Sequence, residues 1–195
     1  MSAVAETLDR LAARAGEEGE PLVLRPEGPS GEPSLGALTA VGPRTAGDPD
    51  RYSFVVESIR EGYLSHYGTS RLLDQPDPDL SLLAGDLFYA IGLNELAGLD
   101  DLESTGILSD LIRVAADLRA TGHPERSAEL WLVQVIALSC GKPEDYDARL
   151  EAVATGDQAV LDELFAWAKT TADRLGMGRE FGVACKAIHL RPSNL

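Results

Sequence analysis

The stretch LSLLAGDLFYAIGLNELA, residues Leu80–Ala97, is the longest strongly apolar segment of the chain. Its apolar residues recur at helical spacing and nearly encircle the helix axis, which predicts a central, buried helix. Gly85 and Gly92 lie seven residues apart and share one face, so we expect either a bend or a neighbouring helix that packs very close to them. Asp86 is the polar residue that stands out, because a buried carboxylate needs a partner.

Asp86 has two interpretations. In the structural one, it bonds a neighbouring helix end or a tyrosine hydroxyl. In the functional one, Asp86 and Asn94 are close to one face and line a polar cleft. The ligand-pocket candidates are then Asp86, Tyr89 and Asn94, with His66 or Arg71 at the mouth of the pocket. A lone histidine such as His66 is more often a surface or capping residue than a ligand or a base.

The segments on both sides of this stretch predict further helices, and therefore an all-α, multi-helix bundle. Apolar residues recur at helical spacing between breaks made by glycine and proline. The expected helices are residues 2–15, 48–67, 80–97, about 100–120, 125–139, 143–154, 157–175 and 177–190. The helix over 125–139 is predicted to be a second buried one. Pro21–Arg25 is the one segment that suggests a short extended piece.

Residues 16–50 differ in composition from the rest of the chain. They hold six of the 11 prolines and seven of the 19 glycines, so regular structure is not expected there. The chain therefore divides into residues 1–50, an N-terminal helix with a Pro/Gly-rich linker or arm, and residues 51–195, a helical bundle domain. The linker is either a tether for the first helix or an arm that wraps a partner.

The charge balance excludes some classes of partner. With 17 lysines and arginines against 32 acids, the net charge is −15, which argues against binding nucleic acid or an anionic membrane. Asp86 and Glu95 interrupt the best apolar run, so no membrane span is expected. The N-terminus lacks the pattern of a signal peptide, and a cytoplasmic location follows as the expectation.

The sequence carries none of the familiar catalytic or metal-binding motifs. It has no phosphate loop, no dinucleotide fingerprint, no CxxC pair, no HExxH and no GxSxG. Cys140 and Cys185 lie in or beside apolar helical runs and are expected to be structural thiols. We expect no catalytic residues, no metal ligands and no cofactor, and a binding or structural subunit rather than an enzyme.

Residues Asp79–Glu103 resemble the trans-polyprenyl diphosphate synthase superfamily, on the strength of LAGD at 83–86 and LAGLD at 96–100. The resemblance implies an isoprenoid-synthase-like helical bundle. It does not extend to the catalytic motifs. The DDxxD motif, which chelates magnesium in that family, has no counterpart between Tyr52 and Asp79. The segment DDLES at 100–104 ends in serine, and it half-fits the motif (N/D)DLxSxxxE, whose last position is Leu108 here.

The resemblance therefore implies a small non-catalytic relative, similar to the smaller subunit of heteromeric heptaprenyl diphosphate synthases. Such a subunit assists a catalytic partner, which alone would supply a magnesium site. Asp86 would be structural or would line the prenyl channel.

Three hypotheses follow for the function. The first is this accessory subunit, acting by packing against a protein partner or as a homo-oligomer. The second is a small ligand-binding protein or enzyme with a pocket near Asp86 and Asn94. The third is an interaction module that uses residues 1–50 as a docking arm.

Overall fold

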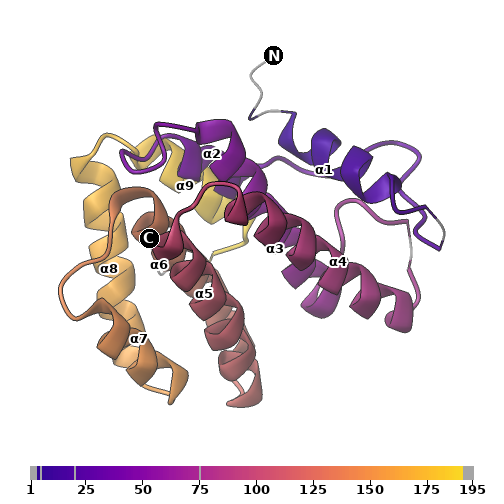
Figure 1. The fold of residues 1–195 in the computed structure, drawn as a ribbon. Helices are drawn as coiled ribbons and strands as arrows, with labels where there is room; N and C mark the ends of the chain where they lie inside the picture. Colours follow the sequence, from indigo (N-terminus) through magenta and orange to yellow (C-terminus); the bar gives the residue numbers. More distant parts are fainter. Residues whose placement is uncertain (1–3, 5, 20, 75, 191–195) are drawn as a thin grey trace. The chain divides into compact units, whose positions relative to one another are not determined.

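The computed structural model describes residues 4, 6–19, 21–74 and 76–190 (Figure 1). Within these residues the chain forms nine α-helices and one short 3-10 turn, with no β-strand, so the predicted all-α class is confirmed. The chain divides into two compact units. Unit 1 comprises Met1–Ala40 and Asp48–Asp101, and unit 2 comprises Val41–Gly47 and Leu102–Leu195. This grouping differs from the predicted division at residue 50, because the N-terminal helices bury their apolar faces on the helices that follow.

Unit 1 is organised around two long antiparallel helices. Its helices are α1 (Thr7–Gly16), α2 (Ser34–Ala40), α3 (Pro49–Tyr67) and α4 (Pro78–Ala97). Helices α3 and α4 lie side by side along most of their length, and α1 and α2 pack against α3 (Figure 1). Asp48 precedes Pro49 at the start of α3, and the Asp77 side chain caps α4 by accepting from the Leu80 N–H, 2.8 Å away.

The N-terminal helix belongs to the core of unit 1. Three apolar residues of α1, Leu8, Leu11 and Ala15, form a narrow buried stripe. They join one cluster with side chains of α3, α4 and the loop between them: Phe54, Leu72, Leu73, Ala84, Phe88 and Ile91. Leu24 forms an isolated antiparallel bridge with Leu73, which agrees with the extended piece predicted at Pro21–Arg25. Burial of this stripe is what holds so short a helix in place.

Helix α2 is a correction to the sequence analysis, which expected no regular structure in residues 16–50. This helix follows Pro33 and packs onto α3 through Gly36. The Gly36 N–H donates to Glu57 Oε1 at 2.6 Å, and a Cβ atom there would lie 2.3 Å from Ser53 Oγ. A glycine that weakens an isolated helix is here the residue that allows the close contact.

Unit 2 has a helix at its centre that is buried along most of its length. Its elements are α5 (Leu102–Ala120), the 3-10 turn Pro124–Arg126, α6 (Ser127–Cys140), α7 (Tyr146–Ala154), α8 (Gln158–Arg174) and α9 (Gly178–Ala187). Every residue from Leu130 to Ser139 of α6 is buried, and α5, α8 and α9 pack around it. The second predicted buried helix is therefore confirmed. Segment 41–47 joins this unit through Arg44, whose backbone N–H donates to the Ser139 carbonyl at 2.9 Å.

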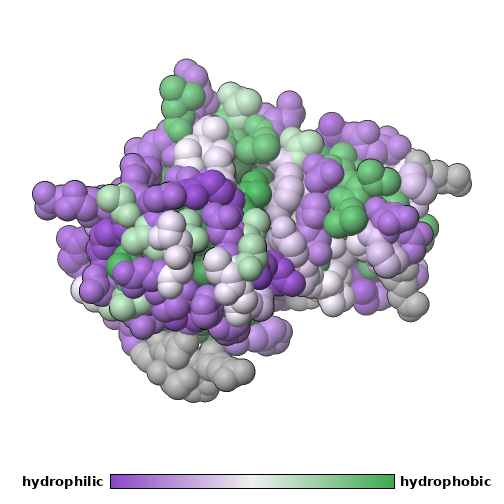
Figure 2. Space-filling model, turned by 90° about the horizontal axis from the view of Figure 1, so that it is seen from below, coloured by the Kyte–Doolittle hydropathy of each residue, from purple (hydrophilic) through white to green (hydrophobic). Residues whose placement is uncertain are grey.

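Helix α4 is not the buried central helix that its composition predicts. Six of its residues are buried and face α3 and α1: Ala84, Gly85, Phe88, Ile91, Gly92 and Leu96. On the opposite side Leu82, Leu83 and Leu93 are 51%, 66% and 38% exposed. Figure 2 shows apolar side chains, in green, at the surface of the part of the molecule that contains α4.

By length and apolar composition alone, α4 also resembles a membrane span, and it is the one such helix in the part of the chain that the structure describes. About a third of the most apolar 18 residues of α4 is buried inside the protein. One apolar helix is weak evidence for a membrane protein, because core helices satisfy the same criteria.

Candidate functional site

The contact between α3 and α4 is built from two aromatic rings that each lie over a glycine of the other helix. The His66 ring covers Gly85, where a Cβ atom would lie 2.2 Å from Cδ2 of the ring. The Tyr89 ring covers Gly62, where a Cβ atom would lie 2.5 Å from Cδ1. The two rings stack on each other at 5.4 Å with 16° between their planes. A Cβ at Gly92 would also lie only 3.1 Å from α3, so the predicted close approach of a neighbouring helix is confirmed.

Asp86 is exposed rather than buried, which corrects the expectation from the apolar pattern. Its side chain is 75% exposed on the outer side of α4. Asp86 Oδ1 lies 3.2 Å from His66 Nε2, a distance suited to an ion pair, although the ring nitrogen lacks the alignment of a hydrogen bond. A solvated carboxylate needs no buried partner, so Asp86 is free to face a second molecule.

Aromatic side chains continue from this stacked pair along α3. Tyr63 and Tyr67 are in ring contact at 5.2 Å, and the Arg60 guanidinium lies 5.2 Å from the centre of the Tyr63 ring. Burial, with a smaller contribution from Tyr67 and Tyr63, raises the pKa of Tyr89 far above its usual value. Its phenol therefore stays protonated at neutral pH and cannot act as a base there.

Arg71 is part of a buried ionic network and does not stand at the mouth of a pocket. Its Nη1 donates to Glu57 Oε2 at 2.8 Å and its Nε donates to Glu61 Oε2 at 2.9 Å. Both carboxylates are fully buried. Burial by itself lowers the pKa of Arg71, but Glu57 and then Glu61 raise it above its ordinary value. The network fixes the start of the α3–α4 loop, since Ser70 also donates to Glu61 at 2.6 Å.

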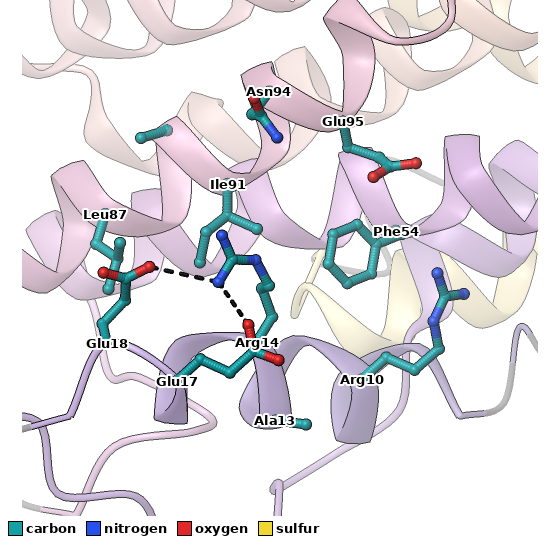
Figure 3. A pocket seen from close by; sticks show the side chains of 11 residues that line it. Arg10, Ala13, Arg14, Glu17, Glu18, Phe54, Leu87, Ile91, Asn94 and Glu95 are labelled. Atoms are coloured by element: carbon teal, nitrogen blue, oxygen red, sulfur yellow. Dashed lines mark hydrogen bonds and ion pairs between the residues drawn. The ribbon is translucent and has the colours of Figure 1, made fainter.

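Asn94 faces a different part of unit 1, a groove of about 560 Å³ between α1 and α4 (Figure 3). Eight residues on an α-helix turn through about 80° beyond two full turns, so Asp86 and Asn94 do not converge. The groove has an apolar floor that includes Phe54 and Ile91. Its walls carry charged side chains from α1, from the turn after it and from α4: Arg10, Arg14, Glu17, Glu18 and Glu95. Arg14 already pairs with Glu17 at 2.7 Å and with Glu18 at 3.4 Å.

The described residues contain no group of three or more histidine, cysteine, aspartate or glutamate side chains that could hold a metal ion. The two aspartates before α5, Asp100 and Asp101, lie in different surroundings. Asp101 accepts a hydrogen bond from the Tyr52 hydroxyl at 2.7 Å, while Asp100 has a positive φ of 53° and is exposed. Burial raises the pKa of Cys185 to about 11, so its thiol stays protonated at neutral pH.

The structure thus brings three of the five predicted residues together, namely His66, Asp86 and Tyr89, and separates Arg71 and Asn94 from them. The sequence analysis did not identify Glu57 and Glu61 as site residues. Their four-residue spacing places them on one face of α3, but it does not show that Arg71 is their partner. The site is a surface of an all-α protein. When compared with known protein families, curated proteins and solved structures, the chain matches none of them.

Proposed function

We propose that this chain is a non-catalytic, cytoplasmic accessory subunit of a prenyl diphosphate synthase complex. It would bind the catalytic subunit through the α4 outer face, which we define as Leu82, Leu83, Asp86 and Leu93 together with Tyr67 of α3. One observation carries the proposal: four large apolar side chains of this face are 38–66% exposed. Several large apolar side chains exposed on one helix face are a common mark of a protein–protein interface.

The spacing along the α4 outer face suits a helix as the binding element. Leu82, Asp86 and Leu93 follow each other at intervals of four and seven residues, which is the repeat by which two helices pack side by side. Asp86 stands in the middle of this row, and a polar group there fixes the register of the partner. A partner helix with leucine-like residues and a lysine or arginine opposite Asp86 fits both the row and the net charge of −15.

The resemblance at residues 83–100 supports a prenyl diphosphate synthase as the partner. The chain keeps the LAGD helix and lacks the aspartate motifs that bind magnesium in that family. The catalytic subunit would therefore supply the substrate site and its magnesium, and this chain would contribute binding surface and no cofactor of its own. A homodimer through the same face is the competing assembly.

Co-expression with the trans-polyprenyl diphosphate synthases of the same genome tests the proposal. We expect one of them to form a stable complex with this chain, measured as mass by size-exclusion chromatography with light scattering. Leu82→Asp or Leu93→Asp should weaken the complex at least about tenfold, because each places a charge in a desolvated interface.

Val183→Asp is the matched control, because Val183 of α9 in unit 2 is likewise exposed, at 49%. It should leave the complex intact. A chain that stays monomeric with every such synthase, or a complex that Leu82→Asp does not weaken, would refute the proposal. A homodimer that Leu82→Asp dissociates would assign the face to a second copy instead.

A ligand-binding role is the second candidate, and the α1–α4 groove is the observation that favours it. The groove joins an apolar floor to Arg10, whose guanidinium lies 5.0 Å from the centre of the Phe54 ring. This arrangement suits a small carboxylate with an alkyl chain, such as decanoate. Calorimetric titration with decanoate should show binding that Arg10→Gln weakens and that Ala90→Glu, at an exposed lining position, removes. Binding unaffected by both substitutions would exclude the groove.

A further inference from the structure

A small polar cavity lies under the α3–α4 loop, apart from the α4 outer face. Its volume is about 260 Å³, and it is lined by one arginine, four hydroxyl side chains and three other residues: Arg25, Ser65, Gly68, Thr69, Ser70, Leu73, Pro76 and Ser81. Among the described residues the lining includes no carboxylate, although the chain has 32 acids against 17 basic residues. The cavity is therefore a local exception to the acidic character of the molecule.

Two of the lining residues, Ser65 and Arg25, each have one buried polar atom without a hydrogen-bond partner. Ser65 is 8% exposed, and its Oγ atom neither donates nor accepts a hydrogen bond. Arg25 Nε is also buried without an acceptor. A buried polar atom without a partner is unfavourable, so a group that reaches either atom would supply a missing hydrogen bond.

The arginine and the hydroxyls all supply hydrogen-bond donors to the cavity lining. Arg25 holds a position beside the loop, because its backbone N–H donates to the Leu72 carbonyl at 2.8 Å. Its Nη2 donates to Glu27 Oε1 at 2.7 Å, and the Glu27 side chain is itself 60% exposed. The Ser70 hydroxyl is occupied, since it donates to Glu61 at 2.6 Å.

Three hydroxyls, those of Ser65, Thr69 and Ser81, and one guanidinium edge thus surround the space. We propose that this cavity binds a small tetrahedral oxyanion, a phosphate or a compound of that class. A guanidinium and several hydroxyls match such an anion in charge and in the number of acceptors that it offers. A metal cation would lack carboxylate ligands among the described lining residues, and an apolar ligand would leave the polar atoms unpaired.

A phosphate on a membrane lipid fits less well than a free one, because a chain of net charge −15 is repelled by an anionic bilayer. The proposal goes beyond the subunit role and does not depend on it.

Titration of the full chain with inorganic phosphate tests the site. Calorimetry in a sodium chloride background should show one phosphate bound per chain. Arg25→Gln should weaken this binding about tenfold or more, since it removes a charge-assisted hydrogen bond to the anion. Arg14→Gln is the matched control, because Arg14 is an exposed arginine of unit 1 outside the cavity, and it should leave the affinity unchanged.

Ser65→Ala separates binding from stability. Without phosphate this variant should be at least as stable as the parent, because the hydroxyl has no partner to lose. With phosphate, the parent should show a rise in melting temperature that Ser65→Ala reduces, beyond the rise that sodium chloride of equal ionic strength gives. Sulfate should compete with phosphate, and acetate should not.

The proposal fails if the parent shows no heat of binding, if Arg25→Gln binds phosphate as tightly as the parent, or if chloride reproduces the whole rise in melting temperature. Binding to vesicles that carry phosphatidic acid, without binding to free phosphate, would overturn the assignment to a free anion.

Discussion

Single residues set the separation of α3 and α4. His66 and Tyr89 are large rings, and each finds room only because the residue beneath it, Gly85 or Gly62, has no Cβ atom. The stacking of His66 on Tyr89 also places His66 beside Asp86. The contact between α3 and α4 therefore positions the polar group in the middle of the α4 outer face. Sequence spacing showed that the glycines of α4 share a face, but not which rings would cover them.

Gly85→Ala should destabilise unit 1 by about 1–3 kcal/mol, because the added Cβ would overlap a ring that Tyr89 prevents from moving away. Urea unfolding followed by circular dichroism measures the effect. Gly106→Ala is the control: Gly106 lies in α5 with nothing within 4 Å of an added Cβ, so the variant should be about 0.5–1 kcal/mol more stable than the parent. If both variants gain stability, the ring-over-glycine packing is wrong.

Arg71→Met should destabilise the protein by about 3–5 kcal/mol, because Glu57 and Glu61 would remain buried without their counter-charge. Arg113→Met provides the comparison. Arg113 has three acidic neighbours, one more than Arg71, but its side chain is 44% exposed, and its loss should cost less than about 1 kcal/mol. Equal losses in the two variants, measured by urea unfolding, would contradict a structural role for the Arg71 network.

At the scale of elements, α4 and α6 show that similar composition leads to different burial. Both are strongly apolar, and both were predicted to be buried. Helix α6 is surrounded by α5, α8 and α9, whereas α4 has neighbours on one side only. The number of elements that pack around a helix depends on the path of the whole chain, so the periodicity of one segment cannot supply it.

The N-terminus of α8 is capped by a side chain, and we expect this cap to stabilise the protein. The Asp157 side chain accepts from the N–H groups of Ala159 at 3.1 Å and Val160 at 3.3 Å, so Asp157→Ala should cost about 1 kcal/mol. Asp48 also precedes a helix but caps none of its N–H groups with its side chain, and Asp48→Ala should cost less than about 0.5 kcal/mol. Thermal unfolding compares the two variants, and a larger loss at Asp48 would contradict the capping geometry.

At the scale of the whole molecule, the chain forms two compact units whose boundaries do not follow the composition of the sequence. Unit 1 takes in α1 and, from the Pro/Gly-rich region, α2, while the short segment 41–47 between α2 and α3 belongs to unit 2. This bears on the hypothesis that residues 1–50 are a docking arm, because α1 contributes buried side chains to the core of unit 1.

Leu11→Ala tests this role of α1. Leu11 is completely buried, so its truncation should destabilise unit 1 by about 2–4 kcal/mol. Leu102→Ala is the control, since Leu102 is 82% exposed and should change stability by less than about 0.5 kcal/mol. Hydrogen exchange at the amides of α3 reports the loss locally. Unchanged exchange in Leu11→Ala would favour a detached N-terminal arm.

The sequence by itself determined the all-α class, the approximate position of eight of the helices and the shared face of Gly85 and Gly92. Those features depend on local spacing, capping residues and breaks, which neighbours in the chain dictate. Only the tertiary structure decided that Asp86 is exposed beside His66, that Arg71 pairs with two buried glutamates, and that Asn94 faces a separate groove. These depend on which helix faces are covered, and contacts between distant segments determine that.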